Sequence, residues 1–395
     1  MENKICELCT NCRTCEMICP KQAISMTEDR EGFLVPTIDN EKCINCNLCR
    51  KKCPQNINKC RDKDNYSGIA YAAQILDKKI LLESSSGGFF SAISYEILKK
   101  GGVIFGATMD ENLRVYHMSI QNTEELRRLR SSKYVASDTL DTFKEAKKYL
   151  DNDRYVLYSG CPCQIAGLKS YLSKNYEKLI TVDIICHGTP SYKLFDVYRK
   201  AMEEKFSTKI TDYKFRDKSK YGWGVYWSFL YNKGSRRKNG GLNDDPYCST
   251  FIKGTANKEA CYKCKYVGFE NRPGDITLGD FWGIDRFHPE MASNGGVSAV
   301  VVNSKCAEKI VENVLKNCKY VITDKNNISQ YNPSLIETVK RPSVRDNIYE
   351  GINEENPLKY IRKKLKIPYR DFFKTKIRLL IPYKLRTMLK KLKRI

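Results

Sequence analysis

Residues 9–20 read CTNCRTCEMICP, and residues 43–54 read CINCNLCRKKCP. Both stretches carry four cysteines in the spacing C-x2-C-x2-C-x3-C, and a proline follows the last cysteine of each. Ten of the eighteen cysteines of the chain lie within its first sixty residues. This part of the sequence is therefore organised around two copies of one thiol pattern.

The spacing is the ligand pattern of a bacterial-type ferredoxin domain with two [4Fe–4S] clusters, in which the fourth cysteine of each run ligates the cluster of the other run. Three closely spaced thiolates in a tight loop reach three irons of a cubane, and the fourth iron is reached from elsewhere. Cys6 and Cys60 fall outside both runs, and we expect Cys6 to be a spectator. The pattern predicts two ligand sets: Cys9, Cys12, Cys15 and Cys53 for one cluster, and Cys43, Cys46, Cys49 and Cys19 for the other.

Two alternatives use the same residue type. Zinc sites usually use two C-x2-C pairs, without a third cysteine in step and without a trailing proline. A disulfide framework needs an oxidising compartment, and residues 1–4 (MENK) show no apolar signal region. The pattern favours iron–sulfur clusters, electron transfer and a cytoplasmic protein.

Length and charge set further limits. A chain of 395 residues predicts two or three domains, and its apolar runs are shorter than the ~18 residues that indicate a membrane span. The net charge is +23, of which residues 359–395 contribute +14, with Asp371 as their single acid. The positive charge is therefore mostly a property of the C-terminal segment.

Beyond the cysteine runs the sequence predicts an α+β protein in three parts. The hydrophobic pattern alternates between strand-like and helix-like segments from residue 69, such as the helical face of 89–100 followed by a strand at 103–108. This alternation indicates an α/β body with a covered sheet, and residues 205–305 look β-rich and aromatic. We expect a ferredoxin-type domain at 1–60, a body at 69–340 and a basic helical tail at 341–395.

A second group of cysteines lies in the body. Cys161 and Cys163 follow a predicted strand, and Cys186 ends the next one, so these residues are expected to converge at one edge of the sheet. Cys261 and Cys264 form a C-x2-C pair, which alone could bind zinc or act as a dithiol. The remaining cysteines are expected to be buried apolar residues, as free cysteines often are: Cys248, Cys306 and Cys318.

Other polar stretches accompany these cysteines. Residues 83–88 (ESSSGG) lead into a helix, whose exposed N–H groups suit an anion, although a capped helix start explains the same residues. Residues 131–134, 215–218 and 272–283 combine charge with aromatic rings, and for each a solvated loop or a packed turn is an equally good interpretation. The G-x-G-x-x-G pattern of dinucleotide-binding folds does not occur in the sequence.

Taken in order, these stretches resemble the coenzyme F420 hydrogenase/dehydrogenase beta-subunit family over roughly residues 69–303. The resemblance implies an iron–sulfur flavoprotein oxidoreductase that binds FAD and a further [4Fe–4S] cluster and exchanges electrons with an organic acceptor such as F420. The stretches that carry it are Ser84–Gly88, Ser132–Tyr134, Gly160–Gly167 (GCPCQIAG), Ile185–Ser191 (ICHGTPS), Phe215–Lys218 (FRDK) and Cys261–Gly283.

The resemblance also implies roles for individual residues. Cys163, Cys186, Cys261 and Cys264 would ligate the third cluster, and Cys161 is left out of this set. Lys133 would stabilise negative charge on the reduced flavin, and His187 could hand over a proton; these two are the candidate catalytic residues. The candidate cofactor contacts are Ser85, Ser86, Gly87, Gly88, Lys133 and Tyr134, with Arg216, Lys218 and Asp280 as weaker candidates.

The expected function is an electron relay from the ferredoxin clusters through the third cluster to FAD, in either direction. An alternative is an electron-transfer subunit without a substrate of its own, which serves a partner such as a ferredoxin or a hydrogenase-like protein. A third interpretation, an iron–sulfur redox sensor at the membrane, leaves the long body unexplained. Nothing in the sequence selects the organic acceptor.

The C-terminal segment reads as a basic amphipathic helix, broken by Pro368 and Pro382. Such helices bind membrane surfaces through apolar burial and attraction to anionic lipid, and we expect peripheral contact at the inner face. Nucleic-acid binding is not expected, because no nucleic-acid motif accompanies the charge. The alternative is a helix docked on the protein itself. The apolar positions are Phe372, Phe373, Ile377, Leu380 and Ile381, then Leu385, Met388, Leu389, Leu392 and Ile395.

Overall fold

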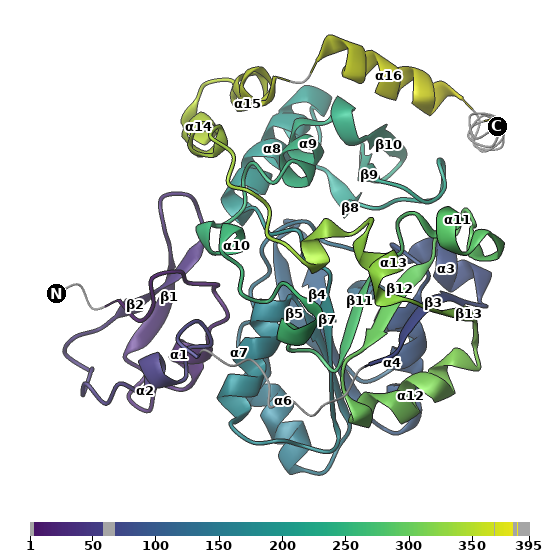
Figure 1. Ribbon diagram of the computed structural model, residues 1–395. Coiled ribbons are helices and arrows are strands. Elements are labelled where there is room, and N and C mark those ends of the chain that lie inside the picture. Colours follow the sequence, from purple (N-terminus) through teal and green to yellow (C-terminus); the bar gives the residue numbers. More distant parts are fainter. Residues whose placement is uncertain (1–3, 58–67, 367, 382–384, 386–395) are drawn as a thin grey trace.

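The computed structural model describes residues 4–57, 68–366, 368–381 and 385. A small N-terminal domain lies beside a larger α/β body, and helices near the C-terminus cover a third, smaller region (Figure 1). Residues 58–67, where the expected N-terminal domain meets the expected body, and the apolar positions beyond residue 385 lie outside the described residues.

The N-terminal domain is built from one hairpin and two short helices. Strands β1 (Ile24–Glu28) and β2 (Leu34–Ile38) pair antiparallel, and the turn between them uses Gly32 at φ +81°, a conformation that favours glycine. Helices α1 (Thr14–Met17) and α2 (Leu48–Lys51) lie within the two cysteine runs.

The body is organised around an eight-stranded mixed sheet with the order β13-β3-β12-β11-β7-β6-β4-β5. Strands β4, β6, β7 and β11 are parallel neighbours, and β3 points the same way, since it is antiparallel to β12, which is antiparallel to β11. The carboxyl ends of five strands therefore meet at one edge. The strands are β3 (Ala70–Ile75), β4 (Val103–Met109), β5 (Val115–Ile120), β6 (Val156–Gly160), β7 (Leu179–Ile184), β11 (Ile276–Asp280), β12 (Ser298–Val302) and β13 (Cys318–Thr323).

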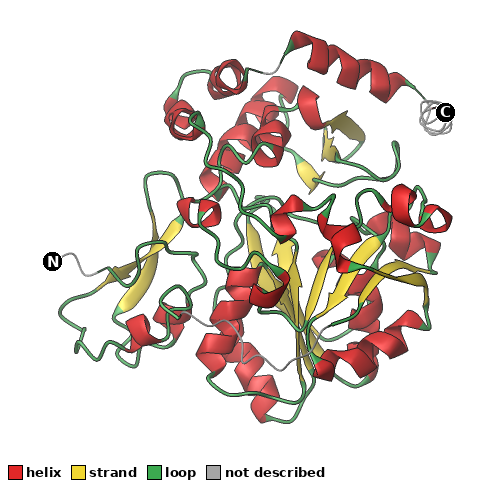
Figure 2. Ribbon diagram, viewed as in Figure 1, coloured by secondary structure: helices red, strands yellow, loops and turns green. Residues whose placement is uncertain are grey.

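Helices cover both faces of this sheet (Figure 2). Strand β12 reads SAVVV and is buried throughout, as expected for a strand covered on both sides. The predicted face of α4 enters the core through Phe89, Ile93 and Ile97. The covering helices are α3 (Lys78–Glu83), α4 (Phe89–Lys99), α5 (Leu126–Leu129), α6 (Thr142–Asp151), α7 (Pro162–Leu172), α11 (Ile284–Phe287), α12 (Lys305–Leu315) and α13 (Lys325–Ser329).

The third region differs from the β-rich expectation for residues 205–305. Only three short strands form a sheet of their own, whereas β11 and β12 join the main sheet. Aromatic side chains such as Phe195, Phe215 and Tyr247 fill a core between this small sheet and helices, so the aromatic density reflects a packed core rather than more strands. Its elements are α8 (Tyr192–Phe206), β8 (Thr211–Lys214), β9 (Tyr226–Tyr231), β10 (Arg236–Gly241), α9 (Pro246–Ile252), α10 (Glu259–Tyr262) and α14 (Arg345–Glu350).

Two helices follow within the segment expected as a basic tail. The apolar face of α15 (Pro357–Leu365) is buried through Ile361 and Leu365 in the same aromatic core. Helix α16 (Tyr369–Leu380) contacts β10 and the 3-10 turn at Leu242–Asp244. Within the described ranges, no helix combines the length and the apolar character needed to cross a bilayer.

Candidate functional site

The two cysteine runs of the N-terminal domain fold into the same loop. Asn11 and Asn45 have φ values of 50° and 52°, and Arg13 and Asn47 have values of 59° and 58°. These left-handed residues occupy equivalent positions between the cysteines. They coil each run tightly, so three thiols of one run face one space.

The first run faces an inner cavity of about 310 Å³, which Cys9, Cys12, Cys15 and Cys53 line together. The Asn11 N–H donates to Cys9 Sγ over 3.3 Å, and the Thr14 hydroxyl oxygen lies 3.3 Å from Cys12 Sγ, whose thiol can donate to it. Cys53, the fourth cysteine of the second run, thus lies with the first three cysteines of the first run.

The second run faces an outer cavity of about 380 Å³. Cys43, Cys46 and Cys49 line it, and Cys19 joins them from the first run, with the Ala23 N–H donating to Cys19 Sγ over 3.3 Å. Cys46 is exposed, whereas Cys12, Cys15 and Cys53 of the inner cavity are buried. The two cavities are therefore alike in ligand pattern and different in exposure.

The inner thiols show the electrostatic strain that a metal cluster would relieve. Burial raises the pKa of Cys12 to about 11 and raises the pKa of Cys15 as well. Cys6 also lines this cavity, and hydrogen bonds with it lower the pKa of Cys9 to about 6 and that of Cys53 to about 7. Thiolates are the ligands of iron–sulfur clusters, so the donor set and the cavity fit a [4Fe–4S] group.

The inner half of the N-terminal domain is fixed to the body by polar contacts. Arg13 Nη2 donates to Asp138 Oδ2 over 2.8 Å, and the Thr14 hydroxyl donates to the Gly167 carbonyl over 3.0 Å. A Cβ atom on Gly167 would come within 2.9 Å of Cys12 Cβ, so this glycine of the GCPCQIAG stretch allows α7 to approach the loop. Ser191 Oγ donates to the carbonyl of Glu31 over 2.6 Å.

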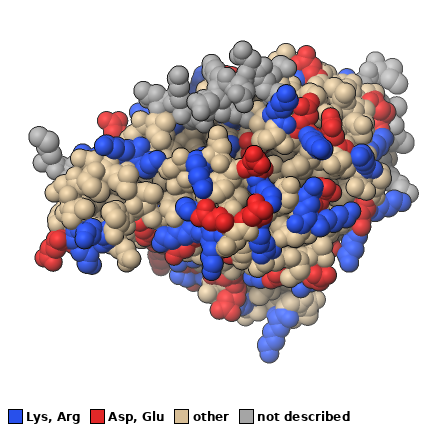
Figure 3. Space-filling view, turned by 90° about the horizontal axis from the view of Figure 1, so that it is seen from below, with Lys and Arg blue, Asp and Glu red and all other residues tan. Residues whose placement is uncertain are grey.

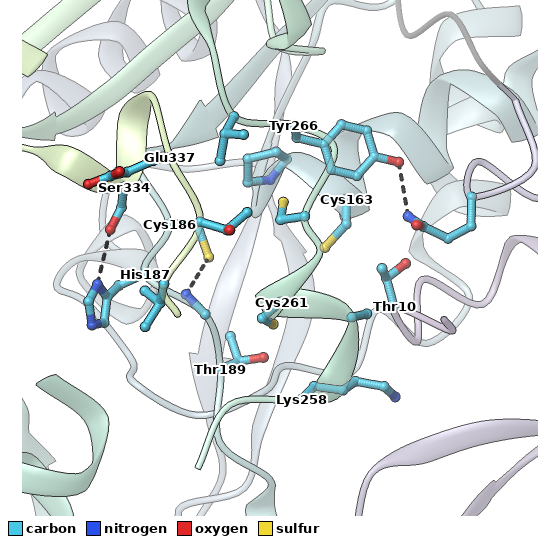
Figure 4. Close-up of a pocket in the computed structure, with 18 of the residues that line it drawn as sticks. Thr10, Cys163, Cys186, His187, Thr189, Lys258, Cys261, Tyr266, Ser334 and Glu337 are labelled. Atoms are coloured by element: carbon cyan, nitrogen blue, oxygen red, sulfur yellow. Dashed lines mark hydrogen bonds between the residues drawn. The ribbon is translucent and has the colours of Figure 1, made fainter. Parts of the chain in front are cut away.

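A third cavity of about 690 Å³ lies between the domain and the body, at the edge where the carboxyl ends of the sheet meet. Cys163 comes from the first turn of α7, Cys186 follows β7, and Cys261 and Cys264 come from α10 and the loop after it. Figure 4 shows Cys163, Cys186 and Cys261 around one space. The four body cysteines of the predicted set thus line one cavity, although they come from three parts of the chain.

Thr10 connects this body cavity to the inner cavity, because it lines both. Its hydroxyl oxygen is buried and has no hydrogen-bond partner among the described residues. An orphaned buried hydroxyl costs free energy, and a sulfur acceptor in either cavity would satisfy it. The site therefore fits a sulfur-rich group on chemical grounds as well as by its thiols.

Cys161 lies next to the body cavity rather than in its wall. Its Sγ lies 3.8 Å from Cys186 Sγ in a hydrogen bond, which lowers the pKa of Cys186 to about 7. The Gly188 N–H also donates to Cys186 Sγ, over 3.4 Å. Burial raises the pKa of Cys163, and it raises the pKa of Cys261 to about 12.

His187 lines the same cavity with both ring nitrogens engaged. Nε2 lies 2.8 Å from the Ile252 carbonyl, and Nδ1 lies 3.0 Å from Ser334 Oγ. A carbonyl only accepts, so Nε2 carries the proton and Nδ1 accepts from the Ser334 hydroxyl. Burial lowers the pKa of His187, so the neutral ring is favoured.

The candidate flavin contacts meet around Arg216, which is buried. Its guanidinium pairs with Asp280 over 2.6 Å and donates to the Tyr134 hydroxyl over 3.1 Å and to the Ser85 carbonyl over 3.2 Å. Asp280 ends β11, and Cys186 lies at the equivalent position after β7, since Ile184 and Leu278 are paired in register. The Arg216 cluster and the body cysteines thus leave the sheet on neighbouring strands.

Two lysines near this cluster face backbone carbonyls. Lys218 Nζ donates to the carbonyls of Leu81, Ser86 and Gly295, and Lys133 Nζ donates to those of Arg128 and Arg130. Desolvation lowers the pKa of each lysine to about 7. An anionic ligand beside these lysines would favour their charged form, so the residues fit a group that carries phosphates.

The glycines of the ESSSGG stretch are required by the fold. A Cβ atom on Gly87 would come within 2.1 Å of the Ala73 carbonyl oxygen, and Gly88 begins α4 at φ +81°. The side chains of Ser85 and Ser86 bond to Ser132 and Ser298. The needs of the fold alone thus explain both glycines. The loop that carries them still lies beside Arg216.

Sequence reasoning missed two residues of this site. Trp223 and Trp282 stack with their ring centroids 4.7 Å apart, and the Trp223 indole donates to Asp280 Oδ1 over 2.7 Å. The Arg216 guanidinium lies 5.2 Å from the Trp282 ring. Trp282 stands in the stretch 272–283 that the sequence singled out, and Trp223 in the aromatic region 205–305; each is followed by a glycine, and this was the available signal.

Comparisons with known proteins find relatives of both the body and the N-terminal domain. Residues 153–327 match the family described as the C terminus of the coenzyme F420 hydrogenase/dehydrogenase beta subunit, and residues 8–57 match the 4Fe-4S dicluster domain. No curated protein matches the chain. Among solved structures, a chain of the xenon-derivatized F420-reducing [NiFe] hydrogenase complex from Methanosarcina barkeri is 18% identical, with a TM-score of 0.44, over 74% of this chain and 97% of that one.

Proposed function

We propose that this chain relays electrons between its two N-terminal clusters and a flavin that reacts with an organic molecule. The premise is that residues 153–327 match the C terminus of the coenzyme F420 hydrogenase/dehydrogenase beta subunit and residues 8–57 match the 4Fe-4S dicluster domain. The chain is an iron–sulfur electron-transfer protein of an oxidoreductase family. The third cluster, the FAD and the acceptor are the proposal. The observation that carries it is one cavity lined by four body cysteines and by Thr10, which also lines the inner cavity.

The residues of the three cavities would hold three [4Fe–4S] groups in series. Cys9, Cys12, Cys15 and Cys53 hold the inner group, with Thr10 between it and the body cavity. Ion pairs at Arg13 and Arg345 keep the domain seated on the body, which fixes the separation that electron transfer depends on. The outer group is held by Cys19, Cys43, Cys46 and Cys49, and the third by Cys163, Cys186, Cys261 and Cys264.

The cluster of residues around Arg216 would hold FAD. When bound, a flavin converts single electrons into a hydride, which iron–sulfur clusters cannot deliver. Arg216 is oriented by Asp280, and Lys218 and Lys133 add positive charge toward phosphates or a reduced ring. Ser85 and Ser86 bring their carbonyls to Arg216 and Lys218, Gly87 and Gly88 follow in the same loop, and Tyr134 bonds to Arg216.

We assign His187 to proton handling at the body cavity. Its Nδ1 accepts from Ser334, so a proton can reach the ring through that hydroxyl. The acceptor remains a small organic molecule of the F420 kind or another, and the electron donor a ferredoxin or a hydrogenase-like protein.

Anaerobic purification with iron, acid-labile sulfide and flavin measured per chain tests the proposal. About twelve irons and one FAD are expected. Cys163→Ser and Cys261→Ser should each lower the iron content by about four, whereas the matched Cys306→Ser, at an exposed cysteine, should leave it unchanged.

The second candidate is an electron-transfer subunit without a substrate of its own. It is favoured by the many internal partners that already satisfy Arg216 and Lys218. About eight irons with no flavin, unaffected by Cys163→Ser, would exclude the flavoprotein and leave that candidate. About twelve irons without flavin would keep the third cluster and reject FAD.

A further inference from the structure

Helix α16 has one face on the protein and another toward solvent. On the docked face, Thr375 and Leu379 lie against Gly241, where a Cβ atom would come within 3.1 Å of Thr375 Cγ2. Lys376 Nζ lies 3.3 Å from Asp244 Oδ2 and fixes the same side electrostatically. The helix is thus held in a defined orientation at one end of the molecule (Figure 1).

The opposite face of α16 presents apolar side chains to solvent. Ile377 is 56% exposed and Leu380 is 82% exposed, and Phe373, one turn before Ile377, is 45% exposed. The positions 373, 377 and 380 recur at helical spacing, so they form one stripe. Leu385, beyond the end of the helix, is 43% exposed and continues the apolar character.

Basic residues border this stripe. Arg370, Lys374 and Arg378 are exposed on the same helix, and residues 359–395 contain fifteen Lys or Arg against Asp371 alone. An apolar stripe with a basic border matches the interface of a bilayer, where acyl chains take the apolar side chains and anionic headgroups take the charges. A partner protein would need a strongly acidic groove to match both features.

We propose that α16 binds the surface of an anionic lipid bilayer, with Phe373, Ile377 and Leu380 entering the headgroup region and Arg370, Lys374 and Arg378 contacting anionic lipid. This contact is separate from the electron relay and does not depend on it. Because the docked face of α16 is tied to β10 and Asp244, the membrane would lie beyond the three-stranded region, with the N-terminal domain to one side (Figure 1).

Vesicle sedimentation of the anaerobically purified full chain tests the proposal. The protein should bind vesicles of phosphatidylcholine with about one-third phosphatidylglycerol, and binding to pure phosphatidylcholine should be at least about tenfold weaker. Raising the salt from about 0.1 M to 1 M should weaken it further, since the Debye length falls from about 10 Å to 3 Å.

A pair of matched variants locates the contact. Ile377→Glu with Leu380→Glu should lower the affinity at least about tenfold, because charge replaces the inserted side chains. Ile322→Glu, at a position on β13 that is 67% exposed, removes a similar apolar side chain elsewhere and should bind like the unchanged protein. Equal binding by the double variant overturns the proposal for α16.

Two other occupants of this face give different outcomes. A second copy of the chain would appear as a dimer in light scattering that the double variant dissociates, without vesicle binding. Nucleic acid would appear as retention of duplex DNA at low salt, again without vesicle binding. Either result overturns the proposal.

Discussion

The inner and outer halves of the N-terminal domain have the same loop and opposite surroundings. Both halves coil through paired left-handed residues, and each gathers four cysteines. The inner half is buried against α7 and the body cavity, whereas the outer half carries the exposed Cys46. The comparison shows that the loop sets the ligand geometry while the environment sets the chemistry of the thiols.

The difference in burial also indicates which half of the N-terminal domain faces the body and which faces solvent. Thr10 lines both the inner cavity and the body cavity, so in the proposed relay the inner half would be the one that exchanges electrons with the body. The outer half presents Cys46 and Ile44, which is 57% exposed, to solvent. An external donor or acceptor would meet this half first. In the view of Figure 3, positive and negative side chains are intermixed over the surface. On that face, charge therefore does not mark the outer half as the place where a partner binds.

The largest expected effect comes from loosening the inner half. Arg345 is 1% exposed, and its Nη1 donates to Glu31 Oε1 over 2.7 Å. Arg345→Ala leaves the Glu31 carboxylate without this partner and should lower the free energy of unfolding by about 3 kcal/mol. Denaturant unfolding measures it, with Arg341→Ala as the control, because that exposed arginine should contribute less than about 1 kcal/mol. Equal losses would show that the domain is not held by the buried pair.

The second largest effect is expected in the pH dependence of stability, and it arises from a buried lysine. Desolvation lowers the pKa of Lys218 to about 7 in the folded protein, from 10.5. Between these pH values the unfolded chain binds a proton that the folded protein does not, so folding becomes more favourable as the pH rises from 7 to 10, and the cost is fully present below pH 7.

Lys218→Met in flavin-free protein removes this dependence. The stability of the unchanged protein relative to the variant should therefore rise by on the order of 2 kcal/mol from pH 7 to pH 9. Unfolding curves at several pH values measure it. The exposed Lys51 of the outer half provides the control, since Lys51→Met should leave the pH dependence as it is. A pH-independent difference for Lys218→Met would mean that this ammonium is not desolvated.

A smaller loss of stability is expected from removing a threonine hydroxyl, and it should differ between the buried inner half and the exposed hairpin. Thr14 is fully buried and donates to the Gly167 carbonyl, so Thr14→Ala should cost about 1 kcal/mol. Thr27 and Thr37 share a hydrogen bond of 2.7 Å on the exposed hairpin, and Thr27→Ala should cost a few tenths, roughly 0.3 kcal/mol. Thermal unfolding compares the two. A larger loss of stability for Thr27→Ala than for Thr14→Ala would contradict the view that contacts of the inner half stabilise the protein more than those of the exposed hairpin.

The last prediction leaves the sequence unchanged. Because Cys46 is exposed and the inner cysteines are buried, a chelator under mild oxidation should remove the outer iron first. About four irons should be lost in a fast phase, before the rest. Iron release followed by absorbance measures it. Loss of all N-terminal iron in one phase would contradict a difference in access between the two halves.

The cysteine groups could be predicted from the sequence to different extents and for different reasons. In the N-terminal domain, the spacing within each run already decides which thiols can face one space. In the body, Cys163 and Cys186 follow neighbouring strands, so the topology of a parallel sheet predicts their convergence. The arrival of Cys261 in the same place depends on α10, which no local pattern positions, and it was expected only through the resemblance.

Other features could not be predicted, because they depend on long-range packing. The stacking of Trp223 on Trp282 and the pairing of Arg345 with Glu31 join segments that are far apart in the chain. Helices α15 and α16 have similar basic composition, yet the apolar face of α15 is buried and that of α16 is exposed. The sequence expectation of one amphipathic tail therefore merged two helices with opposite surroundings.

The pairing of Glu31 with Arg345 has a consequence for biosynthesis. The two residues are 314 positions apart, and Glu31 leaves the ribosome first. At about 5–20 residues per second, roughly 15–60 s pass before Arg345 is made. During that interval the N-terminal domain can be held to the body only through contacts that form with earlier residues, such as Arg13 with Asp138 and Thr14 with Gly167. The Glu31–Arg345 pair is therefore a late contact that locks a domain already seated on the body.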